Sequence, residues 1–174
     1  MISKKNKFIF IIIFAYLGGI SSWITELNDH LYPSLVGTDR SVWLIDIASK
    51  MCSGCQEFHP EFEALAKSFP NVRYGVVYVE DKEGMKLVNK LKGVMDKGLP
   101  AVILVKDEDP YIFTQLVFGD VIKEKDLRKM VVPLVKDLEI VTGIYKRVPK
   151  NSGKKDGTEP TNNIKNKINN KIDL

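Results

Sequence analysis

The chain has 174 residues, a formal net charge of +4, 44% apolar and 28% charged side chains, which fits one folded domain of ordinary size. The positive charge lies at the two ends, with three lysines in residues 1–21 and eight Lys/Arg against three Asp/Glu in residues 146–174. Residues 22–145 hold 15 Lys/Arg against 19 Asp/Glu, a net charge of −4. This negative charge gives no basis for a nucleic-acid-binding domain.

Residues 1–21 have the pattern of a secretory signal peptide. Three lysines precede the apolar run Phe8–Ile20, and Gly19 and Ser21 supply the small side chains of a cleavage site. The run is short for a membrane span. We therefore expect cleavage after Ser21 and a location in the secretory pathway, in the endoplasmic reticulum lumen or outside the cell. In the alternative, an uncleaved segment anchors the same domain on the same side, which is the one route to membrane association that we foresee.

The first half of the domain, taken in chain order, has a helix pattern, a strand pattern and a second helix pattern. We predict a helix over residues 23–35, because Trp23, Leu27 and Leu31 recur every four residues. An apolar run predicts a buried strand over residues 43–47. A helix is then expected over residues 56–69, with an apolar stripe formed by Phe58, Phe62, Leu65 and Phe69.

The second half continues the alternation. A strand is expected at 71–79, a helix at 82–95 with Met85, Val88 and Met95 inward, a hairpin of strands at 101–105 and 111–118, and a closing helix at 124–138. This order predicts an α/β fold, with a mixed central sheet flanked by helices. Residues 146–174 are rich in Lys and Asn with few large apolar side chains, so we expect them to form a disordered tail.

The two cysteines of the chain, Cys52 and Cys55, stand between the strand predicted at 43–47 and the helix predicted at 56–69. A cysteine at the start of a helix presents its thiol to the helix dipole and to free backbone amides, which stabilise the thiolate. The spacing and the position therefore predict thiol-disulfide exchange.

Further residues of this region resemble the thioredoxin superfamily, most closely protein disulfide isomerase domains, over residues 40–140. The matching marks are an acid six positions before the first cysteine, a proline five positions after the second, a Gly-x-Pro before a strand and a glycine that ends the last strand. In this sequence they are Asp46, Pro60, Gly98–Pro100 and Gly119. The resemblance implies a thioredoxin-like fold and a single-domain protein disulfide oxidoreductase of the secretory pathway.

The resemblance also implies roles for individual residues. Cys52 would attack a substrate disulfide and Cys55 would resolve the mixed disulfide. Asp46, if buried near Cys55, would have a raised pKa and accept its proton, whereas the simpler alternative is a solvated or capping acid at a strand end. Pro100 would be in the cis form, although a trans proline that starts a strand is the alternative. The substrate would contact Met51, Ser53, Gly54, Leu99 and Pro100.

Three departures from the family pattern affect the expected redox strength. Met51 stands where a tryptophan is usual, Gly54 stands where isomerase domains have a histidine, and residues 74–79 contain no lysine to pair with Asp46. Because the missing histidine would have stabilised the Cys52 thiolate, we expect a milder oxidant than the isomerase domains. The expected partners are proteins with disulfides or dithiols and a redox partner that recycles the pair, with no cofactor.

Two other functions are compatible with parts of the sequence. Cys52, Cys55 and His59 could share a helix face as zinc ligands, but His30 would be the only natural fourth ligand, so we expect no metal site. The other alternative is a non-catalytic thioredoxin-like binding subunit of a secreted or membrane-associated complex. The presence of both thiols favours redox chemistry over this alternative.

Overall fold

The computed structural model describes residues 24–147, so the predicted signal peptide and residues 148–174 of the predicted tail lie outside the described residues. The elements in chain order are β1 (Ile24–Glu26), η1 (Pro33–Gly37), β2 (Trp43–Ala48), α2 (Ser53–Ser68), β3 (Arg73–Tyr78), α3 (Lys82–Lys90), β4 (Ala101–Val105), β5 (Thr114–Phe118), α4 (Glu124–Val135), β6 (Ile140–Val141) and β7 (Ile144–Tyr145). None of the helices in this part of the chain has the length and apolar character needed to cross a membrane.

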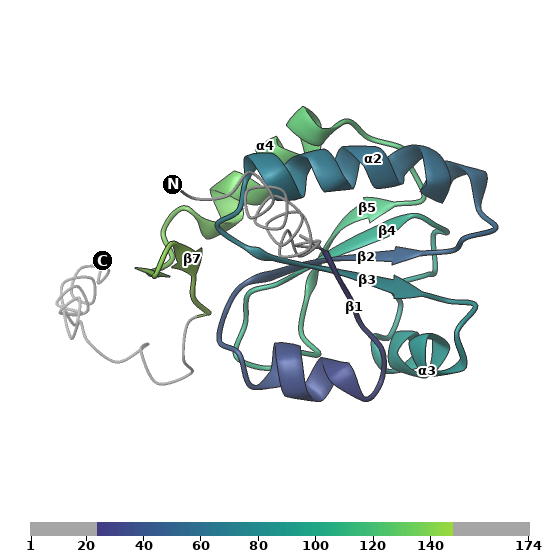
Figure 1. Ribbon diagram of the computed structural model, residues 1–174, viewed down its shortest axis with the longest axis horizontal. Coiled ribbons are helices and arrows are strands. Elements are labelled where there is room, and N and C mark those ends of the chain that lie inside the picture. Colours follow the sequence, from purple (N-terminus) through teal and green to yellow (C-terminus); the bar gives the residue numbers. More distant parts are fainter. Residues whose placement is uncertain (1–23, 148–174) are drawn as a thin grey trace, which may run out of the picture.

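Five of the strands form one mixed sheet in the order β1-β3-β2-β4-β5 (Figure 1). Strands β1 and β2 run parallel to β3, whereas β4 is antiparallel to both β2 and β5. Strand β2 is therefore central, and all six of its residues are buried. The cysteine pair follows the carboxyl end of this central strand, which is where open α/β sheets usually place their functional sites.

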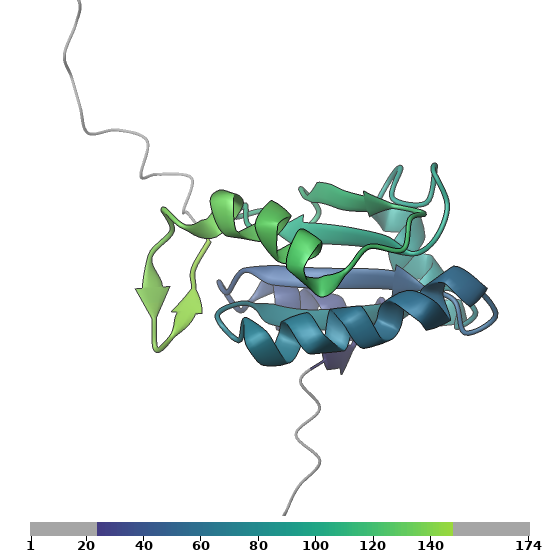
Figure 2. The same cartoon turned by 90° about the horizontal axis from the view of Figure 1, so that it is seen from above.

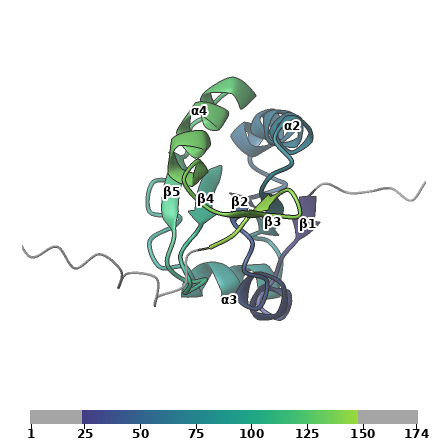
Figure 3. The same ribbon diagram turned by 90° about the vertical axis from the view of Figure 1, so that its left-hand side faces the viewer.

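Helices cover both faces of the sheet. Figures 1 and 3 show α2 and α4 on one face and α3 with η1 on the other, and Figure 2 shows α2 beside α4 from above. Side chains of β2 alternate between the two cores, because Leu44 packs with α2 and α4 while Ile45 and Ile47 pack with α3. The predicted apolar stripe of α2 is confirmed, since all four of its side chains are buried.

The helix predicted over residues 23–35 is wrong for most of its length. Ile24–Glu26 instead form β1, which pairs with β3, and helical structure begins only just before η1. Leu27 is buried against Gly75 of β3, where an added Cβ would lie 2.4 Å from Leu27 Cδ1, whereas Leu31 is exposed. The four-residue spacing therefore did not mark a shared helix face, and Trp23 lies outside the described residues.

The other predicted elements are present with shifted ends. Helix α3 ends at Lys90 instead of residue 95, and the turn that follows contains Gly93 with φ +82°. Val88 is buried as predicted, but Met85 and Met95 are only half-buried. The predicted hairpin is formed by β4 and β5, and α4 begins at the predicted residue and ends three residues early, at 135 against 138.

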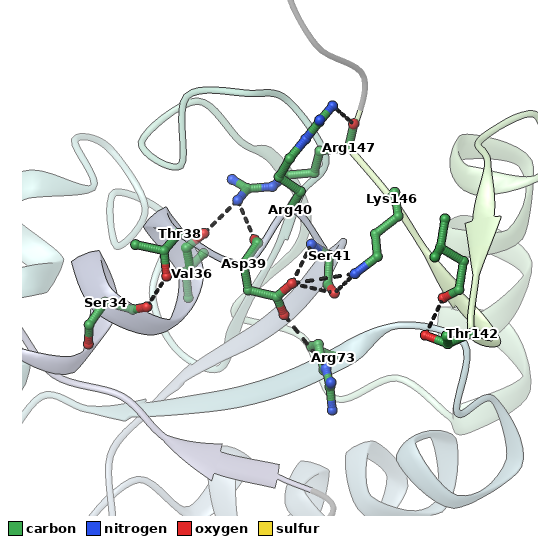
Figure 4. Close-up of polar contacts among 11 residues, drawn as sticks. Ser34, Val36, Thr38, Asp39, Arg40, Ser41, Arg73, Thr142, Lys146 and Arg147 are labelled. Atoms are coloured by element: carbon green, nitrogen blue, oxygen red, sulfur yellow. Dashed lines mark hydrogen bonds and ion pairs between the residues drawn. The ribbon is translucent and has the colours of Figure 1, made fainter.

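The sequence did not predict the small β6–β7 hairpin or the packing of the two residues after it. Arg147 is only 3% exposed, its backbone N–H donates to Arg40 O at 2.7 Å, and its guanidinium donates to the backbone oxygens of Val36, at 2.6 Å, and of Asp39 (Figure 4). Lys146 Nζ donates to Ser41 Oγ at 2.9 Å. Both residues belong to the folded domain, so the predicted tail cannot begin at residue 146.

Candidate active site

Cys52 is the N-cap residue of α2, with an extended backbone at φ −89° and ψ 118°. Its Sγ accepts a hydrogen bond from the backbone N–H of Cys55, with 3.2 Å between nitrogen and sulfur, and lies 3.9 Å from Leu99 O. The side chain is half-buried, and both cysteines are free thiols. A sulfur in this position can be reached from solvent and faces the free amides at the start of the helix.

Cys55 lies one helical turn later and points into the protein. It is 3% exposed and packs with Ala48 and Val76. Burial, followed by a side-chain hydrogen bond with Cys52, raises the pKa of the Cys55 thiol to about 12. At neutral pH Cys55 therefore keeps its proton in the dithiol form, and a base is needed before it can act as a nucleophile.

Asp46 lies on β2 close enough to Cys55 to interact with it electrostatically, as the resemblance implied. It is 0% exposed, and no group within residues 24–147 forms a hydrogen bond with either of its carboxyl oxygens. The solvated or capping acid that was the alternative is therefore excluded. Burial alone raises the pKa of this carboxyl group to about 7, and Asp46 in turn contributes to the raised pKa of Cys55. The group can therefore both hold and release a proton near neutral pH.

The peptide bond between Leu99 and Pro100 is cis, as the resemblance implied. Pro100 meets α2 at Gly54, because a Cβ built on Gly54 would lie 3.6 Å from Pro100 Cδ and 3.9 Å from Cys52 Sγ. The structure thus brings the predicted substrate-binding residues around Cys52. Met51 and Ser53 are exposed, with Met51 at 87%, Gly54 and Leu99 are half-buried, and Pro100 is buried.

Gly119 fixes the loop that carries Pro100 against the end of β5. Its N–H donates to Pro100 O at 2.8 Å, and its φ is +90°. A Cβ at this position would also lie 2.7 Å from Lys97 O, so a side chain is excluded both by the backbone conformation and by space. This close approach is the physical reason for the glycine that the sequence pattern identified.

A contact that the sequence analysis missed holds the segment in front of Cys52. Glu80, which follows β3, accepts hydrogen bonds from the Ser49 hydroxyl and from the Met51 N–H, the latter at 3.3 Å. The hydrogen bond from Ser49 is the main cause of the lowered pKa of Glu80. The sign of this contact in the sequence is an acidic residue shortly after β3, the strand that pairs with β2. The sequence reasoning also missed Tyr78, which packs against the cluster of Ala48, Cys55 and Val76.

The zinc alternative required four side chains at one place, and two of them are used elsewhere. His30 Nε2 lies 3.1 Å from Glu83 on α3, on the other face of the sheet, and His59 Nε2 lies 3.4 Å from Glu63 within α2. Within residues 24–147, no group of three or more His, Cys, Asp or Glu side chains is placed to hold a metal ion.

Comparisons with known proteins agree with this architecture. A family model described as Thioredoxin matches residues 23–131. No curated protein matches the chain in a sequence comparison. Of the solved structures, the J-Trx1 fragment of ERdj5 is similar with a TM-score of 0.55 and 20% identity, over 67% of this chain and 51% of that chain. The chain thus spans about half the length of that fragment.

Two further solved structures have a similar fold. Thioredoxin f from spinach chloroplast, in its long form, has a TM-score of 0.53 and 17% identity over 66% of this chain and 87% of that chain. A chain in the complex of ferredoxin:thioredoxin reductase with thioredoxin f2 has a TM-score of 0.51 and 14% identity, over 64% and 94%. The predicted thioredoxin-like fold is confirmed, with a mixed five-stranded sheet, flanking helices and the two cysteines close together.

Proposed function

Because the chain belongs to the thioredoxin family, we propose that it is a thiol-disulfide oxidoreductase that exchanges disulfides with protein substrates through Cys52 and Cys55. The observation that carries this proposal is the unequal environment of the two free thiols. Cys52 is half-buried at a helix start with an amide N–H on its sulfur, whereas Cys55 is buried one turn later. Such a pair can form an exposed mixed disulfide and then resolve it from inside.

In the reducing direction, the Cys52 thiolate attacks one sulfur of a substrate disulfide. A new bond forms between Cys52 and that sulfur, and the other substrate sulfur leaves as a thiolate. The Cys55 thiolate then attacks Cys52 Sγ, which closes the Cys52–Cys55 disulfide and releases the second substrate thiolate. The substrate gains two electrons and the protein loses two, and a dithiol partner must reduce the protein again. The reverse sequence oxidises a substrate dithiol.

Asp46 supplies the base that the second attack requires. The Cys55 thiol must lose its proton before it attacks Cys52, although its raised pKa keeps it protonated at neutral pH. Asp46 is buried nearby, with no hydrogen-bond partner in the described part of the chain. The pKa of its carboxyl group is about 7, so near neutral pH it can accept this proton and later release it.

The substrate peptide would lie across the residues that surround Cys52. The backbone of Leu99 can pair with an extended peptide, while the exposed Met51 and the small Gly54 leave the sulfur open to a bulky protein substrate. The complex of thioredoxin f2 with its reductase is an example of a related fold bound to a protein redox partner. We propose a partner of that general kind for the recycling of this chain.

The compartment proposed is the secretory pathway, on the basis of the signal-peptide pattern in residues 1–21. N-terminal sequencing of the protein purified from its natural cells tests this proposal. A mature chain that begins at Ser22 is the expected result. A mature chain that retains Phe8–Ile20 would contradict cleavage, and localisation of such a chain to the cytosol would contradict the compartment as well.

Insulin reduction by a dithiol tests the proposed activity, with wild type, Cys52→Ser and Cys55→Ser compared. We expect turnover by wild type only, and accumulation of a mixed disulfide on Cys55→Ser, because Cys52 can still attack but is not resolved. Background rates in all three proteins, without a mixed disulfide, would contradict the enzyme. That result would instead favour the non-catalytic binding subunit.

A further inference from the structure

Tyr78 lies at the solvent edge of the space that holds Asp46. It is the last residue of β3, and the strand register places it beside Ala48, two residues after Asp46 on β2. Side chains at alternate positions of a strand share one face of the sheet. Asp46, Ala48 and Tyr78 therefore all face α2, on the side of the sheet where Cys55 lies.

The immediate surroundings of Asp46 are otherwise apolar. Its strand neighbour in register on β3 is Val76 and that on β4 is Val102, and both are buried. The cluster of Ala48, Cys55 and Val76 is separated from solvent by the half-buried side chains packed against it, which are Ile24, Cys52, Tyr78 and Leu99. Tyr78 is the last residue of β3 and contributes its ring to this covering layer at the carboxyl end of the strand.

Lys50 lies over the outer face of this ring. Its Nζ is 4.4 Å from the centroid of the Tyr78 ring, a favourable cation–π contact. Lys50 belongs to the segment that leads into Cys52, and its backbone oxygen accepts a hydrogen bond from Gln56 Nε2 of α2 at 2.6 Å. The ring is thus covered by a segment that is itself fixed to the active-site helix.

Several charged and titratable groups lie near Asp46 and Tyr78. Two titratable groups face Asp46, Cys55 from α2 and Tyr78 from β3. The other charged groups around Tyr78 are Glu26 of β1, Glu80, Asp81 and Lys50. Burial, with smaller contributions from the carboxylates, raises the pKa of the Tyr78 hydroxyl. The phenol is therefore neutral at physiological pH and acts as a barrier with no charge of its own.

We propose that Tyr78 is a positioning residue for the resolving step, whose ring closes the β3 side of the Asp46 site to water and so sets the proton affinity of that carboxyl group. This inference rests on the proposed function in one respect, which is that Asp46 is the base for Cys55. The shielding acts through the ring and not through the hydroxyl. Tyr78→Phe keeps the ring and should therefore keep the shielding, whereas variants that remove the ring should lose it.

The test is a titration of the Asp46 carboxyl carbon by ¹³C NMR in the reduced full chain, with its signal assigned by its absence from Asp46→Asn. We expect a midpoint near the value of about 7 in wild type and in Tyr78→Phe. In Tyr78→Ser and Tyr78→Val the opened site admits water, and the midpoint should fall by about one pKa unit or more. Val is included because it suits a strand, so one ring-free variant remains if Ser impairs folding.

The matched control is Tyr145→Ser, which removes a half-buried tyrosine ring on β7, at the other end of the sheet (Figure 1). It should leave the Asp46 midpoint unchanged. An unchanged midpoint in both ring-free variants would overturn the inference, and so would an equal shift in Tyr78→Phe, because the hydroxyl would then be responsible.

The pH profile of mixed-disulfide resolution separates this inference from the proposed function. If the Asp46 midpoint falls in the ring-free variants and the resolution profile moves with it, both are supported. If the midpoint falls but the profile does not move, the shielding by Tyr78 stands and the role of Asp46 as the base fails. An unmoved midpoint overturns the shielding whatever the profile shows.

Discussion

The backbone N–H of Cys55 donates a hydrogen bond to the Sγ of Cys52, with 3.2 Å between the two atoms. One cysteine thus supports negative charge on the other while its own thiol is buried and hard to ionise. The same two residues are thereby divided into a nucleophile and a resolving thiol by their position along the first turn of α2.

Gly54→His should make the protein a stronger oxidant. A histidine next to Cys52 would add a cation that stabilises the thiolate, and so the reduced form. The site can accept the side chain, because a Cβ on Gly54 would make only ordinary contacts of 3.6 Å with Pro100 Cδ and Val121 Cγ2. We expect the reduction potential, measured against glutathione, to rise by roughly 30 mV, which corresponds to about 1.4 kcal/mol.

The control for this change is Gly54→Gln, which adds a polar side chain without a cation. It should leave the potential close to that of wild type. An equal rise in both variants would show that the missing histidine is not the cause of the mild potential that we expect for this chain.

Asp46 should make the native state less stable as the pH rises. Its folded pKa of about 7 lies above the ordinary value of 3.8, so the native protein binds this proton more tightly than the unfolded chain does. The resulting stability is fully present below about pH 4 and is lost as the pH rises through about 7. Between pH 5 and pH 8 the loss should be roughly 2–3 kcal/mol.

Urea denaturation of wild type and Asp46→Asn at pH 5 and at pH 8 measures this loss, because asparagine does not ionise. The free energy of unfolding of Asp46→Asn should fall less between the two pH values than that of wild type. Equal pH dependence in the two proteins would mean that Asp46 titrates at an ordinary value. In the same variant, the resolving step should slow near neutral pH.

Gly84→Ala should destabilise the domain, although alanine normally favours a helix. Gly84 lies in α3, where an added Cβ would be 2.1 Å from Tyr78 O, so α3 would have to move away from β3. We expect a loss of about 2 kcal/mol in the free energy of unfolding. Gly37→Ala is the matched control, because a Cβ there would meet its nearest atoms only at 4.0 Å, and its stability should equal or exceed that of wild type.

Arg147→Met should destabilise the domain, even though the residue lies beyond the part of the chain that matches the family model. The change leaves the buried backbone oxygen of Val36 and the partly buried backbone oxygen of Asp39 without the charged donor that now satisfies them. Thermal or urea unfolding should show a loss of roughly 3 kcal/mol. Arg40→Met, which removes an exposed guanidinium with a longer bond of 3.4 Å to Arg147 O, should cost much less.

Much of the fold followed from local patterns that tertiary packing then reinforced. The apolar stripe of α2 has the spacing of one helix face, and the apolar runs of β2 and β4 have the short length of buried strands. The residues before β2 were different. Leu27 and Leu31 have helical spacing, but parallel pairing of β1 with β3 and the space above Gly75 outweighed it.

The sequence by itself determined the cysteine pair, the acid before it and the glycines and proline around it, because each of these depends on a fixed spacing along the chain. Only the tertiary structure decided that Asp46 is buried with no hydrogen-bond partner among residues 24–147, that Tyr78 packs against the cluster around Cys55 and that Arg147 is buried. The physical reason is that burial and proton affinity depend on which distant strands and loops meet at one place. Local sequence patterns do not contain that information.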